Sequence, residues 1–147
     1  MSTKKTEPTH TPTPTGADLA RAWFAHAPFI AMLGLRLVSI NPDHAVVEMP
    51  FRVELATAGD LVHGGAVASL IDTAAALAAW SAHDPSDGAR WGTVGLSLSF
   101  LAPGRGRALQ CDARVSRRGR TICHCHVEVT DSDAKAIAEA LVTYRLG

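Results

Sequence analysis

The chain lacks a net charge, because its 14 Lys and Arg residues balance its 14 Asp and Glu residues. No broad basic face is therefore expected, and nothing in the composition points to nucleic-acid binding. Only three cysteines are present, an odd number that indicates free thiols in a reducing compartment. The first residues lack the apolar segment of a secretory signal. We expect a cytoplasmic protein that binds neither nucleic acid nor membranes.

The length of 147 residues suits one domain with a sizeable core. Apolar residues make up 47% of the chain, which argues against general disorder. Residues 1–16 are mostly Thr, Pro and Lys and predict a disordered or extended tail. No internal repeat is found, so we expect a single domain over residues 17–147.

The stretch around which the chain is organised is LVHGGAVASLIDTAAALAAW, residues 61–80. Its apolar residues fall on nearly every side of a helix, which predicts a buried helix over about residues 65–82. The single acid in it, Asp72, argues against a membrane span and must have its desolvation offset. From composition alone, Asp72 is either a structural acid or a catalytic nucleophile or base.

Strand and helix patterns on either side of this stretch predict an α+β fold. A short helix starts at Asp18 and ends at Pro28, and residues 29–34 form an apolar link. Residues 52–62 and 83–92 read as loops, and Arg118-Gly119 reads as a hairpin turn in which the glycine is free to take a positive φ. Strands are expected over residues 35–40, 45–51, 93–101, 107–116, 121–130 and 135–145. An antiparallel sheet would then wrap one helix.

The segment His63-Gly64-Gly65, followed by Ser69-Leu70-Ile71-Asp72-Thr73, resembles the HGGxxxxLxD segment of hotdog-fold thioesterases. The likeness is to the phenylacetic-acid-degradation (PaaI) type, extends over about residues 30–147, and includes the nine-residue step from His63 to Asp72. It implies a hotdog fold, a curved antiparallel sheet around one long central helix. It also implies hydrolysis of an acyl-CoA thioester to free acid and CoA.

The resemblance assigns roles to residues of this central segment. Asp72 would activate water or attack the thioester, and the backbone N–H of Gly64 would polarise the thioester carbonyl. Glycine at a helix N-terminus also allows a substrate carbonyl to approach free N–H groups. His63 would orient the turn or bond the substrate. No cofactor is expected, because CoA enters as part of the substrate.

Two threonines stand at positions that the family uses. Thr57 lies six residues before the histidine, where the family usually has an Asn that positions the thioester or the water. Thr57 keeps a hydroxyl but lacks the amide, so the positioning of water differs here. Thr93 matches a hydroxyl residue early in the third strand, although a threonine is also simply a good strand former.

Arginines gather at the hairpin turn, and they make a candidate site for the CoA phosphates. Arg117, Arg118 and Arg120 flank Gly119, and guanidinium groups bind phosphate through charge-assisted, often bidentate hydrogen bonds. The alternative is an ordinary solvated, charged turn.

The segment Cys123-His124-Cys125-His126 has the residue types of a metal site but not the expected geometry. On a strand, the two cysteines face one side and the two histidines the other, whereas a tetrahedral zinc site needs all four ligands to converge. We therefore expect no metal here and interpret the cysteines as small core residues.

Two other functions remain open from the sequence: a hotdog dehydratase or isomerase that pairs His63 with Asp72, and a non-catalytic acyl-CoA-binding protein. The identity of the acyl group is equally open between aryl, hydroxylated aryl and medium-chain. A single helix separates Gly64 from Asp72 by about 12 Å, so we expect a dimer whose antiparallel helices complete the site. The resemblance implies such dimers, often paired again into homotetramers.

Overall fold

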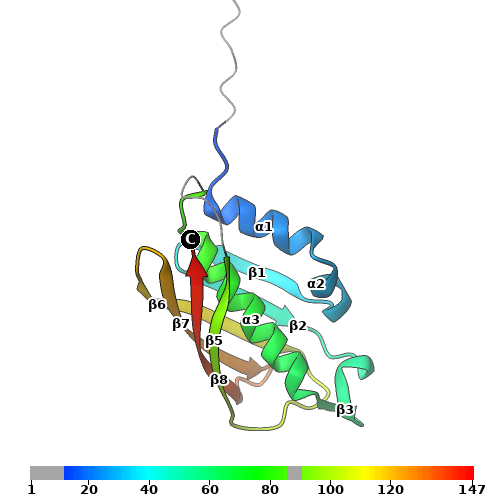
Figure 1. The fold of residues 1–147 in the computed structure, drawn as a ribbon. Coiled ribbons are helices and arrows are strands. Elements are labelled where there is room, and N and C mark those ends of the chain that lie inside the picture. The colour runs from blue at the N-terminus through cyan, green and yellow to red at the C-terminus, as the bar shows by residue number, and fades with distance from the viewer. Residues whose placement is uncertain (1–11, 86–90) are drawn as a thin grey trace, which may run out of the picture.

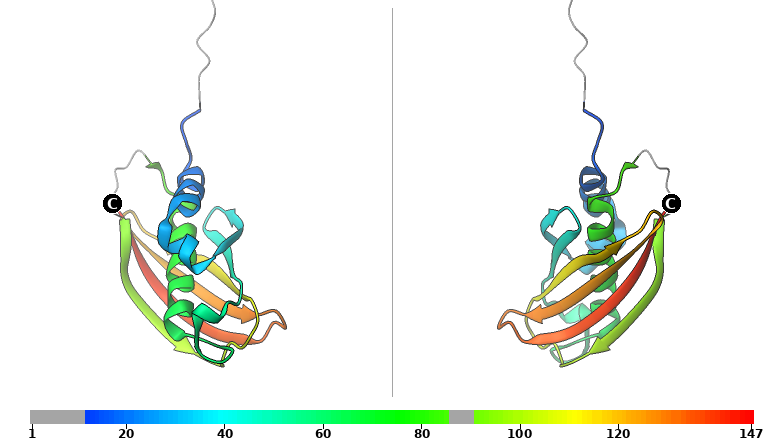
Figure 2. Two further views of the ribbon diagram at one scale, coloured as in Figure 1. Left: turned by 90° about the vertical axis from the view of Figure 1, so that its right-hand side faces the viewer. Right: turned by 90° about the vertical axis from the view of Figure 1, so that its left-hand side faces the viewer.

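The computed structural model describes residues 12–85 and 91–147, and the helix α3, Gly64–Ser81, lies at its centre. A six-stranded sheet curves around this helix in the order β1-β2-β6-β7-β8-β5 (Figure 1). Each neighbouring pair of strands is antiparallel, and the side views show the sheet wrapping α3 (Figure 2). The predicted α+β architecture is confirmed, and it is the hotdog fold.

The strands of the large sheet lie where the alternation predicted them, with ends displaced by one or two residues. They are β1 Arg36–Asn41, β2 His44–Met49, β5 Trp91–Phe100, β6 Leu109–Arg118, β7 Ile122–Asp131 and β8 Ala136–Leu146. The last of these contains helix-forming residues yet pairs with both β5 and β7, because pairing and burial outweigh local propensity.

Alternation along the strands sends one set of side chains into the core against α3. In β7, Cys123 and Cys125 are fully buried whereas His124 and His126 are exposed, as the sequence predicted. The α3 side chains that fill the core include Ala66, Val67, Leu70, Ile71, Ala74, Ala75, Leu77 and Ala78. Over residues 12–85 and 91–147, no helix is both long and apolar enough to cross a membrane.

The helix α1, Gly16–His26, begins two residues before the predicted start at Asp18. Thr15 caps it by accepting a hydrogen bond from the Asp18 N–H, and the Asp18 carboxylate in turn accepts from the Thr15 N–H. The hydrogen bond from the Thr15 hydroxyl holds the pKa of Asp18 below its usual value. Most of the predicted tail, residues 1–11, lies outside the described residues.

The segment expected to be an apolar link is a second helix, α2, Pro28–Leu33. Pro28 stands in its first turn, where its fixed φ suits a helix start and its missing N–H costs nothing. Gly34 ends the helix in the left-handed conformation, with φ of 69°. The first helix does end just before Pro28, as predicted, and the proline also begins α2, which the sequence did not indicate.

Two connections differ from the sequence prediction. Residues 52–62 are not a plain loop but contain the 3-10 helix η1, Val53–Leu55, and the short paired strands β3, Ala56–Ala58, and β4, Leu61–Val62. Gly119 does not take a positive φ. A side chain there would place its Cβ 2.8 Å from the Ile122 carbonyl oxygen, so the turn needs glycine for space. Of the predicted loop 83–92, residues 86–90 lie outside the described residues.

Candidate active site

The N-terminus of α3 is capped by the residue that precedes it. The Nδ1 atom of His63 accepts a hydrogen bond from the Gly65 N–H at 2.8 Å, and the His63 carbonyl accepts from Ala66 and Val67. A helix start leaves its first N–H groups without helical partners. In this first turn, the N–H of Gly64 has no hydrogen-bond acceptor in the described part of the chain.

A side chain at either glycine of this turn would meet a different neighbour. A Cβ on Gly65 would lie 2.9 Å from His63 Nδ1, so the cap requires glycine there. A Cβ on Gly64 would lie 3.0 Å from the tip of the Phe100 ring, which therefore sits directly over Gly64. The Gly64 N–H therefore lies next to the apolar side chain of Phe100.

Asp72 lies two turns further along α3 and is exposed, which corrects the expectation of a buried carboxylate. One face of α3 is only partly covered by the sheet and the other helices. Gly65, Ser69 and Asp72 lie on this face because they are three or four residues apart. Thr93 of β5 donates its hydroxyl hydrogen to Asp72 Oδ1 at 2.5 Å. The structure therefore brings together two of the predicted site residues from different elements.

Gly64 and Asp72 open into different cavities. The Gly64 cavity, about 410 Å³, is also lined by Thr57, Phe100 and Leu101. The Asp72 cavity, about 480 Å³, is lined by residues of α1, α2, α3 and β5. Eight residues at 1.5 Å each separate Gly64 from Asp72 by about 12 Å along the axis, so a single chain holds the two groups apart.

Thr57 and three phenylalanines near the site divide between these cavities and the core. Thr57 is exposed on β3 and faces the Gly64 cavity together with Phe100. Phe29 lines the Asp72 cavity. Phe24 packs against the hydrophobic core and lines neither of the two cavities.

The arginines at the β6–β7 hairpin do not form one uniform group. Arg118 is half-buried and donates hydrogen bonds to the Asp43 carboxylate and to the Ala79 carbonyl oxygen at 2.8 Å. It ties the hairpin to the turn between β1 and β2 and to the end of α3. Arg117 and Arg120 are exposed. A phosphate site is therefore better assigned to these two than to Arg118.

The Cys-His segment of β7 presents no convergent ligands. The two histidines lie on the outer face of the sheet, and His124 Nδ1 is 3.2 Å from the Thr143 hydroxyl. Within the part of the chain that the structure describes, no group of three or more Asp, Glu, His or Cys residues is arranged to hold a metal ion. Burial raises the pKa of the Cys111 thiol, which keeps it protonated.

Comparisons with known proteins agree with this geometry. Residues 59–138 match the family model of the thioesterase superfamily. YigI of Escherichia coli, a medium/long-chain acyl-CoA thioesterase, is 28% identical over 137 residues, covering 83% of this chain and 87% of that protein. The E. coli PaaI protein superposes with a TM-score of 0.79 at 25% identity, covering 90% and 94% of the two chains. A thioesterase family protein from Silicibacter pomeroyi superposes with a TM-score of 0.80 at 28% identity, covering 90% of this chain and 99% of that chain.

The chain belongs to the thioesterase superfamily, because the matched segment spans more than half of its residues. The predicted PaaI-like family and the prediction of a thioester hydrolase are thereby confirmed. Gly64, Asp72 and Thr93 all lie inside the matched segment.

The His63 cap generates the first prediction. Asparagine caps helices well, so His63→Asn should retain both the free energy of unfolding and most of the thioesterase turnover. His63→Ala should lower the free energy of unfolding by about 1 kcal/mol and reduce turnover, because the Gly64 N–H is then less well held. Urea unfolding and thiol-release kinetics measure the two effects. Equal loss of turnover in both variants, with the Asn variant stable, would instead make His63 a proton-transfer group.

Proposed function

We propose that the protein hydrolyses an acyl-CoA thioester to the free acid and CoA. The observation that carries this proposal is the Gly64 N–H at the start of α3, which the His63 cap holds in place and leaves without an acceptor in the described residues. A helix N-terminus stabilises the negative oxygen that forms when a thioester is attacked. The acyl-CoA thioesterase relative adds support for the substrate class.

Asp72 supplies the second half of the chemistry. As a general base, its carboxylate accepts a proton from water while the water oxygen bonds to the thioester carbon. The tetrahedral intermediate then expels the CoA sulfur, which takes up that proton. As a nucleophile, the carboxylate would displace the CoA thiolate and form an anhydride, which water then hydrolyses. The Thr93 hydroxyl occupies Asp72 Oδ1 and so orients the other oxygen for either route.

Thr57 takes the place of an asparagine in the resembled family. Thr57 lines the same cavity as Gly64, so its hydroxyl is proposed to be available to the thioester or to the attacking water. A hydroxyl provides one donor in place of the two of an amide. We therefore assign Thr57 a supporting role in positioning and leave the proton transfer to Asp72.

The active site is shared between two subunits. A reacting carbonyl must lie about 3 Å from both its oxyanion donor and its attacking group, whereas Gly64 and Asp72 lie about 12 Å apart along α3. Two α3 helices that run antiparallel across a two-fold axis place Gly64 of one chain beside Asp72 of the other. A further pairing of dimers into homotetramers stays a prediction.

The edge strand β5 supports this dimer. It pairs only with β8 in the described sheet, and its free edge offers unpaired backbone groups to another strand. Its large apolar side chains are exposed on the single chain: Val94 is 59% exposed, Leu96 40% and Phe100 56%. Thr93, which orients Asp72, belongs to the same strand. A second copy of the chain on this edge would cover apolar surface that lies next to both halves of the site.

Arg117 and Arg120 are proposed to bind the phosphates of CoA. Their hairpin is anchored by Arg118 at Ala79, seven residues or about 10 Å beyond Asp72 along α3. In the antiparallel dimer, the hairpin nearest to a given site therefore belongs to the chain that supplies Asp72. Both side chains are exposed and offer forked donors to a phosphate.

Replacement of Asp72 tests the proposed chemistry. Asp72→Asn removes the charge with little change of shape, so turnover of acyl-CoA should fall by at least about 100-fold while acyl-CoA still binds. The carboxylate is exposed in the chain, so the fold should be unaffected. Thiol release measures turnover. Asp112→Asn, on an acid that pairs with His44 and Arg114, is the control and should retain turnover. Near wild-type turnover by Asp72→Asn would show that Asp72 is structural.

The arginine assignment predicts a separable effect on binding. The double change Arg117→Ala with Arg120→Ala should raise KM for acyl-CoA, most at low salt, and leave kcat nearly unchanged. A pantetheine thioester without the nucleotide should be unaffected by this change. Arg118→Ala should instead lower the free energy of unfolding, because it leaves the Asp43 carboxylate and the Ala79 carbonyl without this partner. Equal losses on both substrates would assign the exposed arginines to fold or assembly.

A further inference from the structure

The Asp72 cavity has one polar wall and one apolar wall. Its polar groups, Ser69, Asp72 and Thr73, all belong to α3, and the Ser69 hydroxyl already donates to the Gly65 carbonyl at 2.8 Å. The facing wall consists of apolar side chains from α1, α2 and β5, among them Trp23, Phe29, Ile30 and Leu96. A volume of about 480 Å³ lies within the range of small-molecule sites. Away from Asp72, such a cavity suits an apolar group.

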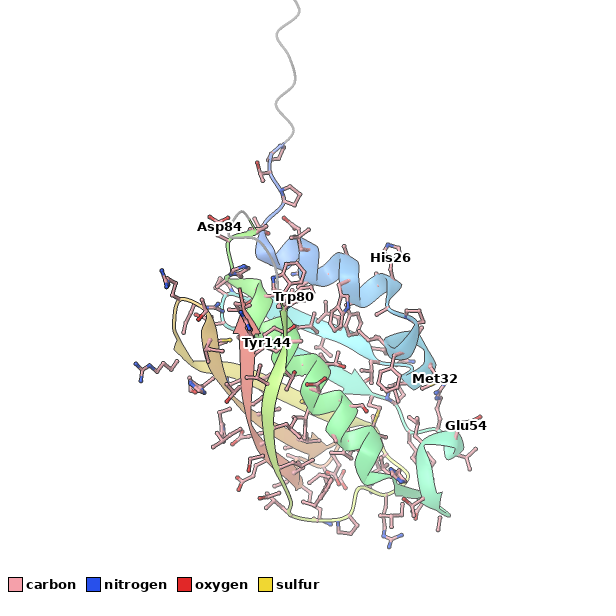
Figure 3. The ribbon with its side chains drawn as sticks, in the orientation of Figure 1. His26, Met32, Glu54, Trp80, Asp84 and Tyr144 are labelled. Carbon is pink, nitrogen blue, oxygen red and sulfur yellow. The ribbon has the colours of Figure 1, made fainter. Side chains whose placement is uncertain are left out.

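A cluster of three tryptophan rings, tilted against one another, lies at the end of this cavity that is remote from Gly64. The Trp23 ring lies 5.2 Å from the ring of Trp80, and Trp80 lies 4.2 Å from Trp91. Trp80 also donates its indole N–H to the Tyr144 hydroxyl at 2.8 Å (Figure 3). Trp80 is eight residues, or about 12 Å, beyond Asp72 along α3. Trp23 thus packs against Trp80, a buried side chain that is itself held by a hydrogen bond.

The helix that carries Trp23 is held firmly against the rest of the fold. At its start, a Cβ on Gly16 would lie 2.2 Å from the Trp80 carbonyl oxygen, so α1 and the end of α3 are in direct backbone contact. Along the helix, Arg21 donates a hydrogen bond to the Ile40 carbonyl at 3.2 Å. A wall fixed in this way does not retreat readily when a longer group enters.

We propose that the acyl chain of the substrate lies in the Asp72 cavity with its far end against Trp23, and that Trp23 limits its length. This inference rests on the proposed function, which places the thioester carbonyl between Asp72 and the Gly64 N–H of the partner subunit. From there the chain runs along α3 towards Trp80. The lining of this cavity contains no Lys, Arg or His to pair with a terminal carboxylate, so acyl groups of dicarboxylic acids are disfavoured.

The test is a chain-length profile of kcat/KM across straight, saturated acyl-CoAs and one CoA ester of a dicarboxylic acid. Trp23→Leu replaces the ring by a smaller side chain and makes room for a longer acyl chain. The ratio of long-chain to short-chain kcat/KM should therefore rise by about tenfold, the effect of one or two buried methylene groups. Trp23→Phe should shift the ratio less in the same direction. Phe24→Leu, on the neighbouring residue that packs into the core, is the matched control and should leave the profile unchanged. The dicarboxylic ester should be a poor substrate throughout.

Three results would overturn the proposal. One is an unchanged profile in both Trp23 variants, and another is an equal loss at every chain length, which would make Trp23 purely structural. The third is a chain-length profile that Leu101→Ala changes and Trp23→Leu does not, because Leu101 lines the Gly64 cavity instead. If Trp23→Leu does not fold, the Trp23→Phe profile decides. A wild-type enzyme inactive on the whole series would contradict the proposed function itself, whereas an active one with an unmoved profile contradicts only the role of Trp23.

Discussion

The packing of α3 inside the curved sheet is the constraint on which the rest of the structure depends. Because α3 is buried along most of its length, the groups at its start and middle are held at a fixed separation. The Gly64 N–H cannot approach Asp72 of the same chain, because the intact helix keeps the two about 12 Å apart along its axis. That separation places the two groups in different cavities, and the exposed acid and the apolar side chains of β5 are what a second subunit is proposed to cover.

The same packing gives the site its chemical character. His63 accepts hydrogen bonds from the neighbouring N–H groups and leaves the Gly64 N–H available to the substrate oxygen that we propose binds there. The partly covered face of α3 carries Asp72, and Thr93 reaches it from β5. Desolvation of the carboxylate, which the sequence led us to expect within one chain, is in this account a property of the assembled dimer and its bound substrate.

Much of the fold was predictable because periodicity and turn residues are local signals. Alternation located the strands, and it also separated the buried Cys123 and Cys125 from the exposed histidines of β7. Other features depend on contacts that no local pattern contains. The exposure of Asp72, the pairing of Arg118 with Asp43 and the contact between the tilted rings of Trp23 and Trp80 all arise between distant segments. The family resemblance pointed to Asp72, Gly64 and Thr93 as candidate site residues, whereas nothing in the sequence singled out Trp23.

The most direct test of the shared site is complementation between two inactive chains. Gly64→Pro removes the proposed N–H donor at a helix position where proline is favoured, after a residue of extended conformation, and Gly64→Ala is the control that keeps the N–H. When Gly64→Pro and Asp72→Asn chains exchange subunits, half of the dimers are mixed and each has one intact site. The account predicts recovery of about a quarter of wild-type activity. No recovery despite demonstrated exchange would contradict it.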